Sequence, residues 1–379
     1  MAETCGPARP LEPAIATAAA HDANALTFSL FRAVSCKAEN VAVSGFVARH
    51  AMGTLAAASP AHEEMWRSLG YQGSERAGRA ELDAWKAASG GVTYTSGARV
   101  FYEQSLHLDP AFEKRSADAF AQRFESLDFK RRPEKTREQI GKWVAETSGG
   151  QLTGPVPKEL VGDDTVLVVG TAFGLEASWE RPFDRSTTKQ AVFTQRSGEA
   201  RPVPMMSQLT PADYGTSDGV QLLDLRLGAL DGRLSVLFVL PPLGTPLETI
   251  ERGLDRATYQ QWLLRLRAEV VHCAIPRFKA ETLLDVSSAL KALAGLELDA
   301  AHVFAGVSEA PPVRLVHQTT VTVDESGVKA TASSVGAFST AADGEAMPSF
   351  VADRPFLFVI RDRESPGSPV LLIGRVGKP

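Results

Sequence analysis

The sequence predicts a protein of the α+β class, in which helices and strands are segregated along the chain rather than alternating. Apolar residues at helical spacing prevail in the first half, and strand-length apolar runs prevail in the second. The 379 residues are 44% apolar and 22% charged, which is a globular composition. Because no repeat period and no long linker divides the chain, we expect one domain over residues 21–379 behind a flexible extension over residues 1–20.

Most of the predicted helices lie in the first half of the chain. Leu26, Leu30 and Val34 recur at helical spacing, and Asp22 precedes them as a residue that can cap the helix. The same signals predict helices over residues 22–34, 47–57, 61–69, 110–124, 134–147, 246–266 and 283–293.

Strands are predicted from short runs rich in β-branched and aromatic residues. They cover residues 98–102, 165–173, 222–226, 234–240, 269–276, 313–323, 356–360 and 370–374. No run approaches the roughly 18 uninterrupted apolar residues that a membrane-spanning helix needs, so we expect no membrane association. A net charge of -5 likewise argues against nucleic acid or anionic lipid as a partner.

The start of the chain does not read as a secretory signal, because Glu12 and Pro13 break its apolar run. As given, it is typical of a cytoplasmic protein, and a trimmed start would fit an extracellular or periplasmic one.

Catalytic and metal-binding signatures are weak. Residues 215–219 fit the GxSxG pattern, but a strand pattern follows Ser217 where the nucleophile elbow needs a helix. We interpret the motif as a turn and keep a hydrolase using Ser217 as a remote alternative. His62 opens a helical zinc motif, yet Trp66 stands where the second histidine is required.

The cysteines indicate neither a zinc site nor a disulfide framework. Cys5, Cys36 and Cys273 are an odd number without CxxC spacing, so we interpret them as unpaired thiols. No metal, no cofactor and no catalytic residue of the chain's own are predicted.

Residues 327–349 break the pattern of helices and strands. They are rich in Ala, Ser and Thr, and their only large apolar residues are Phe338 and Met347. The segment lies between two strong strand patterns, so we predict an exposed loop of a length that is often functional.

The residues that flank this loop are distinctive. HQTTVTVDESG precedes it, and FVADRPFLFVIRD and SPVLLIGRVGKP follow it. These flanks resemble the serpin family in their strand, Glu-x-Gly hinge, alanine-rich loop and FxADRPFLFxI signature. ANALTFSLFRAV, IGKWVAETSGGQL and IPRFKAETLLDVSSALKAL extend the resemblance along the chain in serpin order. The resemblance implies three β-sheets, eight or nine helices and a reactive-centre loop at about residues 328–350.

The resemblance also implies a function, namely irreversible suicide-substrate inhibition of a serine protease by a monomer. The protease's own serine attacks the loop and forms an acyl-enzyme, so the catalytic groups belong to the partner. The cut loop then inserts into the central sheet as a new strand and carries the tethered protease along. The alternative is a non-inhibitory serpin that acts as a binding protein.

The loop sequence is compatible with insertion, because alternate residues of an inserted strand face the core and must be small or apolar. The hinge begins with Glu325, Ser326 and Gly327. The inward set is Val328, Ala330, Ala332 and Ser334. The outward set, which carries the only charge, is Lys329, Thr331, Ser333 and Val335.

In the family, the cleaved bond follows the residue sixteen positions after the hinge glutamate, which here is the Ala341-Ala342 bond. A methyl side chain suits a shallow specificity pocket, so the target is expected to be elastase-like or subtilisin-like. The loop is a few residues longer than usual, and the competing positions are Phe338, Thr340, Ala342 and Met347.

Two further groups of family positions match this chain. The breach, where the loop first enters the sheet, corresponds to Trp179, Arg277 and Glu325. The shutter, which controls sheet opening, corresponds to Ser44, Thr171 and His317. Arg277 is expected to pair with Glu325, whereas the shutter departs from the family pattern at Gly45, Val47 and Thr171.

Overall fold

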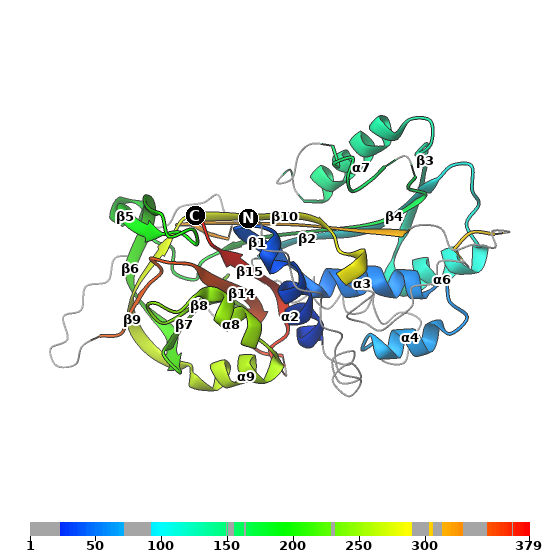
Figure 1. Ribbon diagram of the computed structural model, residues 1–379. Coiled ribbons are helices and arrows are strands. Elements are labelled where there is room, and N and C mark those ends of the chain that lie inside the picture. Colours follow the sequence, from blue (N-terminus) through cyan, green and yellow to red (C-terminus); the bar gives the residue numbers. More distant parts are fainter. Residues whose placement is uncertain are drawn as a thin grey trace.

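The computed structural model describes residues 23–71, 92–148, 150, 155–162, 164–228, 232–289, 303–305, 313–328, 347–365 and 367–379. The expected extension over residues 1–20 lies outside them. Helices and strands are segregated as an α+β fold, as the sequence predicts (Figure 1). None of the described helices is both long and apolar enough to cross a membrane.

Most of the described helices lie in the first half of the chain, and α8 and α9 lie between strands of the second half. Their bounds are α2 Ala23–Val34, η1 Ser35–Lys37, α3 Gly45–Ala56, α4 His62–Ser68, α6 Pro110–Phe120, α7 Pro133–Thr147, η2 Arg185–Thr187, α8 Leu247–Gly253 and α9 Arg256–Arg265.

Three predicted helices differ from the structure by more than a shift of one or two residues at an end. The helix predicted over residues 110–124 ends at Phe120, because Ala121 takes a left-handed conformation with φ 53° and a strand follows. The helix predicted over residues 246–266 is divided, because the Asp255 side chain accepts from the Thr258 amide and caps α9. The helix predicted over residues 283–293 overlaps a strand that continues to Asp285.

The strands form two hydrogen-bonded sheets. The first has the order β1-β15-β14-β8-β7-β6-β9-β13, with β5 beside β6, and the second has the order β10-β11-β12-β4-β2-β3. Their bounds are β1 Asn40–Val43, β2 Val92–Glu103, β3 Arg123–Leu127, β4 Leu167–Ser178, β5 Lys189–Thr194, β6 Ala200–Ser217, β7 Val220–Leu227, β8 Leu234–Leu240, β9 Arg267–Pro276, β10 Phe278–Asp285, β11 Val313–Asp324, β12 Gly327–Val328, β13 Ser349–Val351, β14 Phe356–Asp362 and β15 Val370–Val376.

Strand β6 explains why three expected sheets form two continuous ones. It pairs with β5 and β9 over its first part and with β7 over its last part, so it runs from one layer into the next. The prediction missed β6 because Pro202, Pro204 and Pro211 interrupt it, and proline weakens a strand pattern.

The second sheet is the layer that an inserting loop would join. In Figure 1, α7 lies on one side of this sheet and α3 on the other. Trp143 of α7 packs closely because β4 has a glycine beneath it: a Cβ on Gly170 would lie 2.8 Å from the indole ring. A helix therefore covers each face of the strands β2 and β4.

The GxSxG motif forms a β-hairpin, which confirms the interpretation as a turn. Ser217 pairs with Val220 across a two-residue turn. Asp218 and Gly219 both have positive φ, at 50° and 79°, as a type I′ turn requires. Ser217 is therefore not on a nucleophile elbow.

One cysteine differs from the sequence expectation. Cys36 is disulfide-bonded, so the interpretation of all three cysteines as unpaired thiols is wrong. Cys273 is free and buried.

Candidate functional site

The hinge before the loop is already part of the second sheet. Strands β11 and β4 pair in parallel from Val313 to Thr319, and at their other end β12 lies between them. Gly327 pairs with Asp324 and Ser178, and Val328 pairs with Val323 and Ala177, each time antiparallel. The chain after Glu325 thus begins as an inserted strand.

The side chain of Val328 faces the core, as the predicted alternation requires. It is 0% exposed and lies in a hydrophobic cluster with Val321, Val323 and Ala177. Gly327 approaches β4 so closely that a Cβ would lie 2.0 Å from the Ala177 carbonyl oxygen. Only glycine fits this position in the observed arrangement.

A tight turn between β11 and β12 places β12 in the sheet. The Asp324 carboxylate accepts hydrogen bonds from both the amide and the hydroxyl of Ser326, each at 2.8 Å. This is an Asx-type turn, a local signal that the Asp-x-Ser sequence could have revealed. It reverses the chain between β11 and β12.

Backbone and side-chain bonds from residues 179–183 hold the hinge. The Trp179 amide donates to the Ser326 carbonyl at 3.0 Å, and its indole Nε1 donates to the Asp324 carbonyl at 2.9 Å. The Phe183 amide donates to the Glu325 carbonyl at 2.8 Å. The residue pattern points to Trp179 but not to Phe183, because a backbone hydrogen bond does not depend on the type of side chain.

Arg277 and Glu325 form the expected ion pair. The guanidinium donates from Nε to both carboxylate oxygens at 2.9 and 3.0 Å, and from Nη2 at 2.6 Å. The Thr188 hydroxyl also donates to Glu325. Burial raises the pKa of Glu325, but the bonds from Arg277 and Thr188 outweigh it, so the pKa lies below its ordinary value.

Ser44 and His317, which the resemblance assigns to the shutter, are in contact. The Ser44 amide donates to His317 Nε2 at 3.1 Å, and the Thr319 hydroxyl lies 2.8 Å from the same nitrogen. The Ser44 hydroxyl accepts from the Val47 amide and so caps α3. This contact ties the amino end of α3 to β11. Thr171 aligns with His317 in the β4–β11 register, and its side chain lies outside the described part.

Burial keeps His317 neutral. The residue is 0% exposed, and burial lowers its pKa to about 4. Because an amide can only donate, Nε2 is the acceptor nitrogen, and a proton there would break the bond to Ser44.

Most of the loop lies outside the described residues. This holds for the remaining hinge residues 329–334, for the proposed bond Ala341-Ala342, and for its competitors Phe338 and Thr340. Met347, just after this segment, is 49% exposed. The roles assigned to these residues remain predictions.

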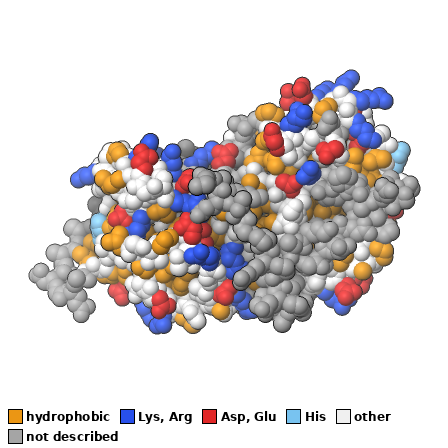
Figure 2. All heavy atoms as spheres, in the orientation of Figure 1, with side chains coloured by type: hydrophobic (Ala, Val, Ile, Leu, Met, Phe, Trp, Pro, Cys, Tyr) orange, Lys and Arg blue, Asp and Glu red, His pale blue; other side chains and the backbone are white. Residues whose placement is uncertain are grey.

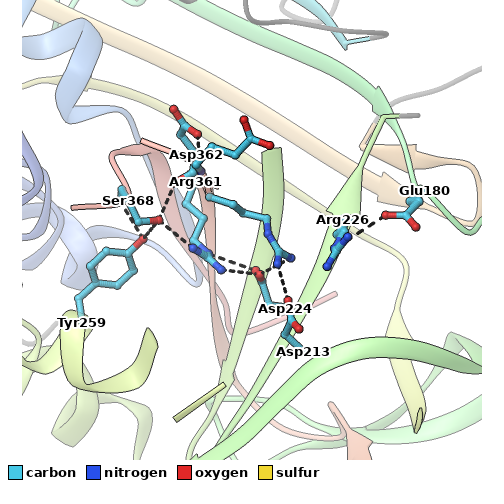
Figure 3. A network of polar contacts seen from close by, with 10 residues as sticks. Glu180, Asp213, Asp224, Arg226, Tyr259, Arg361, Asp362 and Ser368 are labelled. Carbon is cyan, nitrogen blue, oxygen red and sulfur yellow. Dashed lines mark hydrogen bonds and ion pairs between the residues drawn. The ribbon is translucent and has the colours of Figure 1, made fainter. Parts of the chain in front are cut away.

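A second polar network lies in the first sheet (Figure 3). Arg361 donates to Asp224 at 2.6 Å, Arg363 bridges Asp224 and Asp213, and Tyr259 donates to Ser368. The carboxylates are paired with arginines and lie between strands, so the network is a structural tie between β6, β7 and β14.

The charged side chains and the possible metal ligands show no cluster in the parts described below. On the face drawn in Figure 2, Lys and Arg side chains are intermixed with Asp and Glu. Within the described ranges, no group of three or more His, Cys, Asp or Glu residues could hold a metal ion.

Together these observations define a class of protein: an α+β fold whose central sheet is forked, with a loop hinge held in the fork. The model of the serpin family, described as serine protease inhibitors, matches residues 21–379. The chain therefore belongs to the serpin family.

Relatives and solved structures agree with this assignment. Mouse (Mus musculus) Serpin B12 is 30% identical over 75% of this chain and 69% of its own length. Leukocyte elastase inhibitor of Bos taurus is 29% identical over 90% of this chain and 94% of its own. In fold, the chain is similar to Serpin48 of Tenebrio molitor, with a TM-score of 0.79, 22% identity and coverage of 97% and 99%. It is equally similar to human thyroxine-binding globulin, with a TM-score of 0.80, 18% identity and coverage of 96% and 99%.

Proposed function

We propose that this protein is an irreversible suicide-substrate inhibitor of a serine protease with elastase-like or subtilisin-like specificity. The observation that carries the proposal is β12, because the hinge enters the sheet with an apolar residue facing the core. The sequence that follows has small residues at the positions predicted to face the core. The leukocyte elastase inhibitors among the relatives support the same reading.

Insertion would add strand pairs to the fork in the central sheet. Below β12, the strands β11 and β4 are direct neighbours and pair with each other from Thr319 back to Val313. Separating them admits a strand with two new neighbours. About a dozen new backbone pairs at roughly 0.5–1.5 kcal/mol each would contribute on the order of 10 kcal/mol. The uncut protein would then be held from insertion by a kinetic barrier.

A non-inhibitory serpin is the second candidate function. The fold similarity to thyroxine-binding globulin shows that the same architecture serves a binding protein. In that case a protease would cut the loop without being trapped.

Incubation with elastase and with subtilisin separates the two functions. Inhibition produces a covalent complex that survives boiling in detergent, whereas a binding protein yields only a clipped chain. Mass spectrometry of the released carboxyl-terminal fragment then identifies the cut bond. A cut at any bond other than Ala341-Ala342 would contradict the assignment to Ala341.

Ala341→Arg tests the specificity of the proposed bond. An arginine there should redirect inhibition toward trypsin-like proteases, because their specificity pocket binds a cationic side chain. Met347→Arg is the matched control at a competing position and should leave the preference unchanged.

A further inference from the structure

Cys36 is disulfide-bonded, and the identity of its partner follows from the other two cysteines of the chain, Cys5 and Cys273. Cys273 is free, and its side chain is 0% exposed in a hydrophobic cluster with Phe350. Burial raises the pKa of the Cys273 thiol to about 12, so the reactive thiolate does not form there at neutral pH. Cys5, which lies outside the described residues, is the one cysteine that remains.

The backbone around Cys36 is held by a buried arginine. Cys36 lies in η1, which follows directly after α2. The guanidinium of Arg375 is 0% exposed and donates to the carbonyls of Ser35 and Ala38, on either side of Cys36. Arg375 in turn pairs with Glu251 at 3.0 Å. Cys36 itself is half-buried, so a residue that is fixed in place borders on solvent, where an oxidant or a reductant can reach it.

The length of the chain allows Cys5 to reach Cys36. From Ala23 to Cys36 the chain rises about 20 Å along α2 and η1. Residues 6–22 join Cys5 to the start of α2, and a segment of this length reaches about 50 Å when it is extended. A bond between Cys5 and Cys36 therefore closes a loop over residues 5–36 that contains the whole of α2, without stretching the connection.

The helix inside this loop belongs to the core. Every residue of α2 is buried or half-buried, and the helix packs against α3 and β15. Closing a loop around such a helix restricts the unfolded chain and thereby stabilises the folded one. Reduction of the bond leaves the contacts of α2 in place, so we expect the reduced protein to keep its fold and to unfold at a lower temperature.

We propose that Cys36 is bonded to Cys5, which ties the amino-terminal extension to the end of α2, and that the protein acts in an oxidising compartment.

Formation of the bond needs an oxidant of the disulfide class, for which oxidised glutathione serves. One protein thiolate attacks a sulfur of the oxidant and releases one glutathione thiol. The second protein thiolate then attacks the mixed disulfide and releases the other glutathione thiol. The two cysteines together lose two protons and two electrons, and the oxidant is reduced to two thiols.

The bond also selects between the compartments that the start of the sequence leaves open. Cytosolic thiols are kept reduced, whereas disulfides persist in the extracellular space and the periplasm. An extracellular or periplasmic protein is therefore expected, and a cytoplasmic one is not. Neither the bond nor the compartment depends on protease inhibition.

Counting thiols in the full chain tests the bond. After refolding in a mixture of reduced and oxidised glutathione, a maleimide should label one thiol per denatured chain, and three after reduction. Digestion without reduction should yield the Cys5 peptide joined to the Cys36 peptide, which mass spectrometry identifies. Cys273→Ser is the matched control, because it should leave no thiol to label and keep the joined peptides. Three labelled thiols before reduction, or a link that involves Cys273 or a second chain, would overturn the assignment.

Thermal unfolding with and without reductant tests the effect on stability. Reduction should lower the unfolding temperature of the wild type by about 3–6 °C, given the length of the closed loop. Cys5→Ser should unfold at the temperature of the reduced wild type and show no further fall on reduction. Cys273→Ser should keep the full shift. Equal unfolding temperatures of the oxidised and the reduced wild type would overturn the stabilising role of the bond.

Thiol trapping in the cells that make the protein tests the compartment. Acid quenching protonates thiolates and stops exchange, and alkylation in denaturant then labels the thiols that were free. We expect one labelled thiol per chain. If the refolded chain forms the bond but the protein from its own cells carries three free thiols, the bond stands and the oxidising compartment is wrong.

Discussion

Glu325 is buried at the hinge, and its carboxylate forms an ion pair with Arg277, whose side chain is partly exposed. The side chain of Glu325 is 2% exposed, whereas that of Arg277 is 44% exposed. Solvent screens the arginine but not the carboxylate, so the pair matters mainly because an unpaired buried carboxylate is costly.

Arg277→Ala should therefore destabilise the intact protein by about 1–3 kcal/mol, since it leaves a buried acceptor unsatisfied. Freed from this contact, the hinge should also insert without cleavage, and inhibitory activity should decay faster at 37 °C. Chemical denaturation and timed assays measure the two effects. Lys279→Ala is the control, because Lys279 pairs with Glu281 at 2.7 Å on the surface and such pairs contribute less than about 1 kcal/mol. Equal effects of the two variants would argue against a special role for Arg277.

His317 makes the stability depend on pH. Its folded pKa of about 4 lies below the unfolded value near 6.5, so its contribution is complete above pH 6.5 and is lost as pH falls toward 4. Between pH 7 and 5 this loss amounts to about 2 kcal/mol. We expect the unfolding temperature of His317→Gln to fall less steeply over this range than that of the wild type. Thr319→Val keeps the imidazole and should keep the steep fall. Parallel curves for His317→Gln and wild type would contradict the assignment.

At the scale of elements, local patterns predict those strands and helices whose residues agree with their surroundings. The strands β8, β14 and β15 were predicted from their apolar runs, and β11 from its many β-branched residues. The end of α6 at Phe120 was not predicted, because Ala121 adopts a left-handed conformation that alanine rarely takes. Strand β6 was not predicted, because its prolines count against a strand in a local pattern. In the structure, neighbouring strands on both sides hold it in the sheet.

The residues of the candidate site also divide into those that the sequence predicts and those that it does not. The resemblance supplied Trp179, Arg277 and Glu325, and the structure brings them together. It could not supply Thr188 or the Ser44–His317 bond in detail, since partners 137 and 273 positions apart are brought together only by the tertiary fold.

Strand β12 is the element on which the proposed insertion depends. Val328→Arg would place a guanidinium in the hydrophobic cluster beneath the sheet at a cost of several kcal/mol. We expect the loop of this variant to leave the fork and the inhibitor to become a substrate, with many more molecules consumed per protease trapped. Val328→Thr keeps the β-branched shape and should remain an inhibitor. Titration of residual protease activity gives the stoichiometry, and an unchanged value for Val328→Arg would contradict insertion at this position.

For the whole molecule, cleavage should raise stability although it breaks the chain. The nick frees the residues after Val328 to continue β12 between β11 and β4, where every added residue gains two strand neighbours. A gain on the order of 10 kcal/mol corresponds to an unfolding temperature about 10–20 °C higher for a chain of this size. Circular dichroism of intact and subtilisin-nicked protein measures the difference. Nicked Val328→Arg should show no such increase, because its first inserting residue blocks the fork. If the wild-type chain unfolds at the same temperature before and after the cut, the forked sheet does not store the free energy that trapping a protease requires.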